Sequence, residues 1–264
     1  MGQIHPTAWV DSEVDLAPSV IVGPGCIIEG RVTIGDNTRL LANVHIQGPT
    51  TIGRNCTFYP FCCIGFPPQD RKFDPSHAGA GLVIGDDNVF RESVTIHRAT
   101  GERPTTIGHR NYFMVNSHVG HDVIIGDDCT LANGALLAGH VEMSDRVILG
   151  GNAAVHQFCR IGRLAMLSGI AAVTQDLPPF CTVYNMRQVG SLNVVGLRRA
   201  GLRDHIAPLQ RAFEILYRER HANPAACDLI EAELGHDPLC RELVAFVRSS
   251  KRGITGYTHA ADEA

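Results

Sequence analysis

The sequence lacks the features of a secreted, membrane-spanning or nucleic-acid-binding protein. Its 264 residues carry a formal net charge of −4, which argues against general binding to nucleic acid. No run of about 18 apolar residues is present to span a bilayer, and the N-terminal stretch MGQIHPTAWVDSEVD has no basic-then-apolar signal pattern. We therefore expect a soluble, cytoplasmic protein without stable insertion into a membrane.

The cysteines also exclude some classes of protein. Nine are present, and no two of them form a C-x-x-C pair. An odd and scattered set of this kind argues against a disulfide framework and against structural zinc. A reducing cytosol fits best, and a 44% apolar content is enough to bury a real core.

The strongest positive feature is a six-residue repeat. Every sixth position is apolar in three phases separated by two breaks, and glycine often follows the apolar residue, as in Val22-Gly23 and Ile125-Gly126. The repeated positions are Ile4, Val10, Leu16, Val22, Ile28, Ile34, Leu40, Ile46, Ile52, Phe58 and Ile64, then Ile84, Phe90 and Ile96, and then Ile107, Phe113, Val119, Ile125, Leu131, Leu137, Met143, Leu149, Val155, Ile161, Leu167 and Val173.

This repeat predicts a mainly β fold. Three hexads make one triangular coil of 18 residues, and stacked coils pair as short parallel strands about 4.8 Å apart with the aliphatic residue inside. We expect a β-solenoid domain over residues 1–185. It should contain roughly ten coils and stand roughly 48 Å tall.

The two breaks predict loops that leave the stack. Twenty residues separate Ile64 from Ile84, and eleven separate Ile96 from Ile107. We expect extruded loops near residues 66–82 and 98–105. On so regular a scaffold, a loop of this length is more often functional than a tolerated insertion.

Residues 186–264 no longer follow the repeat and predict a second, helical domain. The stretches NVVGLRRAGL, IAPLQRAFEILYRER, AACDLIEAEL and PLCRELVAFVRS are amphipathic and are separated by Gly, Pro and Asn. Between Arg187 and Arg220 there are seven arginines and three acids. This excess indicates either a solvated helix face or a docking patch for an acidic partner.

Polar residues gather along one stripe of the predicted prism. Residue n+18 lies over residue n, so Gly139 stacks on His121 and Gln157 stacks on Gly139. Three further histidines flank the same stripe: His118, His140 and His156. Three interpretations compete: a metal site, a general base with its supporting acid, or solvated histidines. A metal requires at least three convergent ligands, and we expect none here.

A general base needs fewer groups. One imidazole with a carboxylate on its other nitrogen is sufficient, and His121 with Asp122 could supply both. Gly139 has no side chain, so its backbone N–H could approach a developing oxyanion. This arrangement suits acyl transfer.

With these residues in view, the chain resembles the UDP-N-acetylglucosamine O-acyltransferases of lipid A biosynthesis. The resemblance covers nearly the whole chain, and the non-hexad pieces in this order make it specific. The matching stretches are IHPTA at 4–8, PQDRKF at 68–73, RESVTIHR at 91–98, HVGHDVIIG at 118–126, LAGHV at 137–141, AVHQF at 154–158, QDLPP at 175–179 and RSSKRG at 248–253.

The resemblance implies a left-handed parallel β-helix, a homotrimer with sites between neighbouring prisms, and no metal or other cofactor. The expected donor is a 3-hydroxyacyl chain on acyl carrier protein, an acidic partner, and the acceptor is a UDP-sugar. His121 would be the base, Asp122 its support and Gly139 the oxyanion donor. Substrate contacts would come from Asp70, Lys72, His118, His140, Gln157, Asn193 and Arg199, and Gly169 would measure the acyl chain.

Alternatives remain open because the tail departs from the family pattern at Val195 and over residues 181–192. The acceptor could be a different sugar nucleotide, such as a 3-amino UDP-sugar, or the donor could be acetyl-CoA. The sister N-acyltransferase carries an extra domain before its hexads, which here start at Ile4. A purely structural solenoid would leave the histidine stripe and the extruded loops unexplained.

Overall fold

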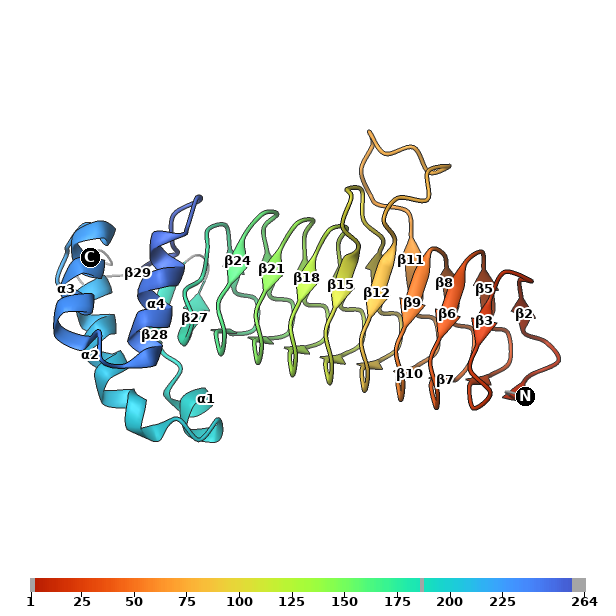
Figure 1. Cartoon of the computed structure of the whole chain (residues 1–264), viewed down its shortest axis with the longest axis horizontal. Helices are drawn as coiled ribbons and strands as arrows, with labels where there is room; N and C mark the ends of the chain where they lie inside the picture. The colour runs from red at the N-terminus through yellow and green to blue at the C-terminus, as the bar shows by residue number, and fades with distance from the viewer. Residues whose placement is uncertain (1–2, 186–187, 258–264) are drawn as a thin grey trace.

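The computed structural model describes residues 3–185 and 188–257. Figure 1 shows a long prism of stacked coils that begins at the N-terminus and is covered at its far end by a group of helices. The prism is a left-handed parallel β-helix with three sheets, so the expected fold class is confirmed. Each turn of the chain contributes one short strand to each sheet.

The strands of each sheet stack in chain order. Sheet A contains β1 (Gln3–Ile4), β4 (Ile21–Val22), β7 (Arg39–Leu40), β10 (Thr57–Phe58), β13 (Val89–Phe90), β16 (Tyr112–Phe113), β19 (Thr130–Leu131), β22 (Ile148–Leu149), β25 (Met166–Leu167), β27 (Cys181–Asn185), β28 (Gln188–Leu192) and β29 (Gly256–Tyr257). Sheet B contains β2 (Trp9–Val10), β5 (Ile27–Glu29), β8 (His45–Gln47), β11 (Cys63–Phe66), β14 (Thr95–His97), β17 (His118–Val119), β20 (Leu136–Leu137), β23 (Ala154–Val155) and β26 (Ala172–Val173). Sheet C contains β3 (Asp15–Leu16), β6 (Val32–Ile34), β9 (Thr50–Ile52), β12 (Leu82–Ile84), β15 (Thr105–Ile107), β18 (Ile124–Ile125), β21 (Glu142–Met143) and β24 (Arg160–Ile161).

The register between strands follows the 18-residue spacing of the sequence. In sheet B, Val119 pairs with Leu137, Leu137 with Val155 and Val155 with Val173, all in parallel. Within the described residues, ten strands from β1 to β27 stack in parallel in sheet A. The expected number of coils therefore agrees with the structure.

The repeated apolar residues fill the interior. Every one from Val22 to Val173 is buried, and the rings of Phe58, Phe90 and Phe113 stack with centroids 4.5 and 4.8 Å apart. The three repeated positions of the first coil are the exceptions, because no coil lies beneath them: Val10 and Leu16 are only partly buried, and Ile4 has 48% of its surface exposed. The core thus runs along the prism axis and leaves the outer faces to other side chains.

The corners of the prism need a left-handed backbone. At one corner of successive coils, Asp122, His140 and Phe158 have φ of 59°, 60° and 63°. Asp and His tolerate this region better than most residues, whereas the bulky Phe adopts it only where the surrounding structure imposes it. These corners set the directions of Asp122 and His140, which matters for the site.

Two segments leave the stack where the repeat breaks. The longer one runs from Pro67 to Gly81, between β11 and β12, and projects from the prism in Figure 1. The shorter one, residues 98–104, connects β14 to β15. Both emerge between sheet B and sheet C.

The C-terminal helices are α1 (Val194–Arg199), a 3₁₀ turn η1 (Arg203–His205), α2 (Ile206–Tyr217), α3 (Asn223–Leu234) and α4 (Pro238–Arg248). Asn193 caps α1 by accepting from the backbone N–H of Gly196, and Asp237 caps α4 by accepting from Leu239 and Cys240. In the described part of the chain, no helix has the length and apolar character that crossing a membrane requires.

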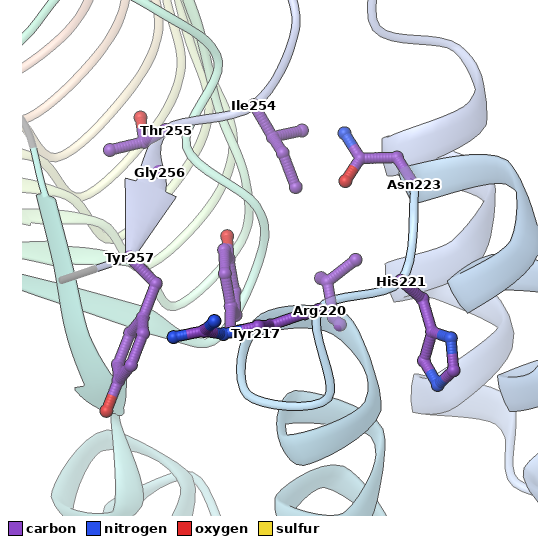
Figure 2. A pocket seen from close by; sticks show the side chains of 9 residues that line it. Tyr217, Arg220, His221, Asn223, Ile254, Thr255, Gly256 and Tyr257 are labelled. Atoms are coloured by element: carbon purple, nitrogen blue, oxygen red, sulfur yellow. The ribbon is translucent and has the colours of Figure 1, made fainter. Parts of the chain in front are cut away.

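The junction between prism and helices is continuous. β28 pairs antiparallel with β27, and β29 pairs parallel with β28, so sheet A extends into the C-terminal region. The expected domain boundary after residue 185 adjoins residues outside the described part of the chain and stays a prediction. Between the helices and the segment 254–257 lies a cavity of about 450 Å³. Figure 2 shows Tyr217 and Arg220 of the helical part on one side of it and the segment 254–257 on the other.

Candidate active site

His121 and Asp122 form a hydrogen-bonded pair on the outer surface of sheet B. They follow β17 and lie in the corner before β18. His121 Nδ1 is 2.7 Å from Asp122 Oδ2, which the left-handed φ of Asp122 makes possible for two adjacent residues. Because Nδ1–H donates to the carboxylate, Nε2 of His121 is the nitrogen that remains to accept a proton.

The short extruded segment holds the Asp122 carboxylate. Asp122 accepts from the backbone N–H of Thr100, from the Thr100 hydroxyl at 2.6 Å and from the N–H of Gly101 at 3.0 Å. Burial alone would raise its pKa, but these hydrogen bonds and the one from His121 hold the pKa of Asp122 below its ordinary value. The carboxylate is therefore ionised at neutral pH and fixes the orientation of the imidazole.

Gly139 lies directly against the imidazole. A Cβ atom at this position would be 2.7 Å from both Cε1 and Nε2 of His121, so no larger residue fits without moving the ring. Among the described residues, the N–H of Gly139 has no hydrogen-bond acceptor, although its neighbour His140 donates to His121 O. A free N–H beside the free Nε2 is the pairing that acyl transfer requires.

His140 completes a small polar cluster. Its Nε2 is 3.7 Å from Asp122 Oδ2, and its ring stacks on Phe158 with centroids 4.5 Å apart. The ligating atoms of His121, Asp122 and His140 all lie within 4.8 Å of one another, which is close enough to hold a metal ion. The carboxylate already accepts hydrogen bonds from Thr100, Gly101 and His121, and a metal ion would compete with these donors for its oxygens.

Two further histidines lie nearby, His118 in the same coil as His121 and His97 in the preceding coil. His118 Nδ1 is 2.7 Å from Thr95 Oγ1, and the ring of His97 meets that of His118 edge to face at 5.1 Å. Burial, together with the neighbouring histidines, lowers the pKa of His97 to about 4, and burial also lowers the pKa of His118. Both rings are neutral at pH 7. His97 Nδ1 is buried and has no partner among the described residues.

The sequence did not indicate His97 as a site residue. His97 follows the inward-pointing Ile96. The short extruded segment adds residues between this coil and the next, so Ile96 pairs with Val119 instead of with a residue 18 positions later. The 18-residue spacing therefore does not align His97 with the other histidines. Its place in the stretch RESVTIHR was the available signal.

His97, His118, His121 and Gly139 line one cavity of about 500 Å³, here called the histidine cavity, and neither Asp122 nor His140 lines it. Within the described ranges, no acidic side chain lines it. Its lining residues are Gln69, His97, His118, Gly120, His121, Leu136, Leu137, Ala138, Gly139, Ala154, Val155, His156, Gln157, Ala172, Val173 and Thr174. Of the predicted contacts, His118 and Gln157 line the cavity directly. Asp70 and Lys72 lie next to Gln69 in the long extruded segment, where Asp70 accepts from the Lys72 N–H.

The remaining predicted contacts lie on another face. Asn193 and Arg199 line a cavity of about 980 Å³, here called the arginine cavity, against sheet A. Its residues are Asp128, Thr130, Arg146, Ile148, Leu164, Met166, Thr182, Tyr184, Ser191, Leu192, Asn193, Val194, Val195, Gly196, Arg199 and Ala200. The Asn193 amide also donates to Leu164 O at 2.8 Å. Gly169 lines neither cavity, and a Cβ there would meet Gly151 O at 3.4 Å.

The coils and the site define a transferase built on hexapeptide repeats. A family model described as bacterial transferase hexapeptide (six repeats) matches residues 31–65 and 104–139. A second model, described as UDP N-acetylglucosamine O-acyltransferase, domain 2, matches residues 176–255. The chain belongs to the UDP-N-acetylglucosamine O-acyltransferase family.

Curated relatives and solved structures agree with this assignment. A protein of Thermodesulfovibrio yellowstonii named acyl-[acyl-carrier-protein]–UDP-N-acetylglucosamine O-acyltransferase is 43% identical over 96% of this chain and 99% of its own length. An Anaeromyxobacter protein (strain Fw109-5) of the same name is also 43% identical, with the same coverage. The Moraxella catarrhalis enzyme structure matches with a TM-score of 0.90 and 36% identity over 96% of this chain and 99% of that one.

Proposed function

We propose that this protein transfers a 3-hydroxyacyl chain from acyl carrier protein to the 3-hydroxyl of UDP-N-acetylglucosamine, the first step of lipid A biosynthesis. Membership of the family supports the acyl carrier protein donor and the UDP-N-acetylglucosamine acceptor, since both are in the names of its near full-length relatives. The observation that carries the chemistry is the close packing of the His121 ring against Gly139, 2.7 Å from where a Cβ would lie, together with a Gly139 N–H that has no acceptor among the described residues. These two groups can act on one acyl carbon.

In the proposed reaction, His121 Nε2 removes the proton from the sugar hydroxyl as its oxygen attacks the thioester carbon. The carbonyl oxygen becomes an oxyanion that accepts from Gly139 N–H. When this intermediate collapses, the C–O bond remains, the C–S bond breaks, and the imidazolium returns its proton to the carrier thiolate. Asp122 stabilises the imidazolium and is not itself protonated.

The other predicted residues would bind the substrates. His118 and Gln157 line the histidine cavity and would contact the acceptor, as would His140 beside it. Asp70 and Lys72 would reach the sugar nucleotide from the long extruded segment. Gly169 would measure the acyl chain, because its missing side chain leaves room for a long acyl group; an added Cβ would meet Gly151 O of the preceding coil at an ordinary 3.4 Å. No metal ion or other cofactor takes part in this reaction.

We also propose that the protein is a cytoplasmic homotrimer. The histidine cavity lies on sheet B and the arginine cavity on sheet A. Both faces expose an apolar side chain, Leu136 on β20 and Ile148 on β22. Packing sheet A of one subunit against sheet B of the next brings the two cavities together and buries both residues. Asn193 and Arg199 would then serve a neighbouring subunit's site.

The acidic carrier protein would dock on the arginines around α1 and η1. Arg198, Arg199 and Arg203 are exposed and form no ion pair with any described residue. Arg211 differs because it pairs with Glu219 and Glu233. The patch is thus smaller than the sequence count suggested, and Arg187 lies outside the described residues.

Mass spectrometry of the product tests this function. The enzyme is given 3-hydroxyacyl and unsubstituted acyl carrier thioesters of several lengths, or acetyl-CoA, with UDP-N-acetylglucosamine or its 3-amino analogue. We expect an O-linked 3-hydroxyacyl ester from the carrier thioester only. An acetyl product from acetyl-CoA, or an amide formed on the amino sugar alone, contradicts the proposal.

A further inference from the structure

The segment after α4 is fastened to the last coils of the prism. Asp176 is buried and accepts from Ser250 Oγ at 2.8 Å, while its own N–H donates to Gly253 O at 3.1 Å. Arg160 forms an ion pair with the same carboxylate at 3.0 Å. Gln175 Nε2 also donates to Arg252 O at 3.2 Å. The backbone around Arg252 is therefore held in place against the prism.

This anchoring brings the Arg252 side chain to one end of the histidine cavity. Its Nη2 donates to Thr174 O at 3.2 Å and is 3.5 Å from His156 Nδ1. Both Thr174 and His156 line the cavity. His156 Nδ1 is also 3.1 Å from Gln157 O, and when its N–H donates to that carbonyl it accepts no hydrogen bond from Arg252.

The guanidinium of Arg252 is not neutralised by the protein. Among the described residues, no carboxylate oxygen lies within the 4.0 Å that defines an ion pair with it. The other arginines near the last coils differ, since Arg160 pairs with Asp176 and Arg163 with Glu242. The histidine cavity supplies no acid either. Arg252 is exposed, and an uncompensated cation beside a cavity that no described carboxylate lines is suited to an anionic ligand.

We propose that Arg252 binds a phosphate group of a substrate at this end of the histidine cavity, with the His156 ring beside it. The inference rests on the proposed function, in which both substrates carry phosphate. One source is the diphosphate of the sugar nucleotide, and the other is the phosphodiester of the arm that holds the acyl chain on its carrier. Guanidinium binds either through charge-assisted hydrogen bonds.

The register of the coils places this phosphate site relative to the reaction. Gly120, Ala138, His156 and Thr174 are spaced by 18 residues and lie in successive coils. Thr174 is thus three coils from His121's neighbour Gly120, roughly 14 Å at ~4.8 Å per coil. A phosphate separated from the reacting carbon by a spacer fits this position. A phosphate attached directly at the reaction centre does not.

Calorimetry with the full-length trimer tests the proposal with UDP and 4′-phosphopantetheine as separate probes. Arg252→Gln should weaken the binding of one probe about tenfold, and Arg252→Lys should restore part of that affinity. The probe that loses affinity identifies which phosphate is bound. Lys251→Gln is the matched control, because Lys251 is the adjacent exposed cation and should leave both affinities unchanged.

Steady-state kinetics provide the second readout. Arg252→Gln should raise KM for the corresponding substrate about tenfold with little change in kcat. If the wild-type enzyme turns over and Arg252→Gln alters neither probe affinity nor either KM, the proposal is wrong. If the wild type transfers no acyl group at all, the proposed function fails instead, and the calorimetry still decides the role of Arg252. Sedimentation of each variant confirms that the assembly is unchanged.

Discussion

The imidazole of His121 occupies the space that a side chain at position 139 would fill, 2.7 Å from where its Cβ would lie. Gly139→Ala should therefore push the ring away from the Gly139 N–H and lower kcat by about 10²-fold to 10³-fold, the cost of losing one oxyanion donor. The melting temperature should change little, because the ring can move outward. Kinetic assays and thermal unfolding measure the two effects.

Gly151→Ala is the matched control for this change. Its added Cβ would meet only Asn133 O, at an ordinary 3.5 Å. If Gly139→Ala and Gly151→Ala are equally active, the close contact between Gly139 and His121 has no role in catalysis.

The second prediction concerns His121 itself. His121→Ala removes the proposed general base and should lower kcat by about 10²-fold to 10⁴-fold. The core does not depend on this side chain, so sedimentation and circular dichroism should match the wild type. His118→Ala should act more on KM for the acceptor. His236→Ala, an exposed histidine on the helical part, serves as the control.

The same experiment decides between base and metal. Since His121, Asp122 and His140 could together hold an ion, the enzyme is also assayed after treatment with EDTA. We expect unchanged turnover. Activity that disappears with EDTA and returns with zinc would replace the general-base assignment with a metal site.

A third prediction follows from the buried His97. Its pKa of about 4 in the folded protein lies below the ordinary value of 6.5, so the unfolded chain binds more protons between these values. The stability that His97 contributes is fully present above pH 6.5 and is lost as the pH falls towards 4. The loss should reach up to about 3 kcal/mol per subunit at the acid end.

Urea unfolding at pH 7 and pH 5, at one fixed protein concentration, measures this effect. His97→Gln should lose less stability than the wild type between the two pH values. His236→Gln, which replaces an exposed histidine, should behave like the wild type. Equal losses for wild type and His97→Gln would show that the ring is not held neutral.

The sequence predicts the prism better than it predicts the site. The hexad positions from Val22 to Val173 are all buried as expected, because an 18-residue coil leaves each of them only one direction to point. The same arithmetic places Gly139 beside His121. The 18-residue spacing does not hold across a break in the repeat. The position of His97 beside His118 and the hydrogen bonds from Thr100 to Asp122 therefore could not be derived from spacing.

The helical tail is less predictable for a related reason. It shares no period with the coils, so the sequence gives no register between Asn193 or Arg199 and the histidines. The structure places these two residues against sheet A, while the histidines lie on sheet B. Their separation within one chain is what makes a site between subunits necessary for the proposed contacts.

A fourth prediction concerns docking of the carrier protein. Charge reversal at Arg198, Arg199 and Arg203 should raise KM for acyl carrier protein about tenfold at low salt, and the effect should fade as salt screens the charges. Reversal at Arg31, Arg39 and Arg54, three exposed arginines nearer the N-terminal end, is the matched control. If charge reversal at Arg198, Arg199 and Arg203 does not change KM for acyl carrier protein at low salt, these arginines are only a solvated helix face.

The last prediction concerns Arg98, which is 4% exposed and yet has no carboxylate partner among the described residues. Its guanidinium donates to Gln47 Oε1 and Gly65 O on the prism, both at 3.1 Å. It also donates to Pro75 O and His77 O in the long extruded segment, both at 3.3 Å. One buried cation thus ties this segment to the prism, and the segment carries Gln69 into the histidine cavity.

Arg98→Met keeps the apolar stem but removes every one of these hydrogen bonds, so the segment should detach while the stacked coils remain. We expect KM for the acceptor to rise about tenfold, since hydrogen bonds from a charged group contribute about 1.5–3 kcal/mol, and trypsin should cleave faster at Arg71 and Lys72. Arg98→Lys should restore part of both properties. Arg103→Met, at an exposed position of the short segment, should change neither, and unchanged cleavage of Arg98→Met would show that the segment is held by other contacts.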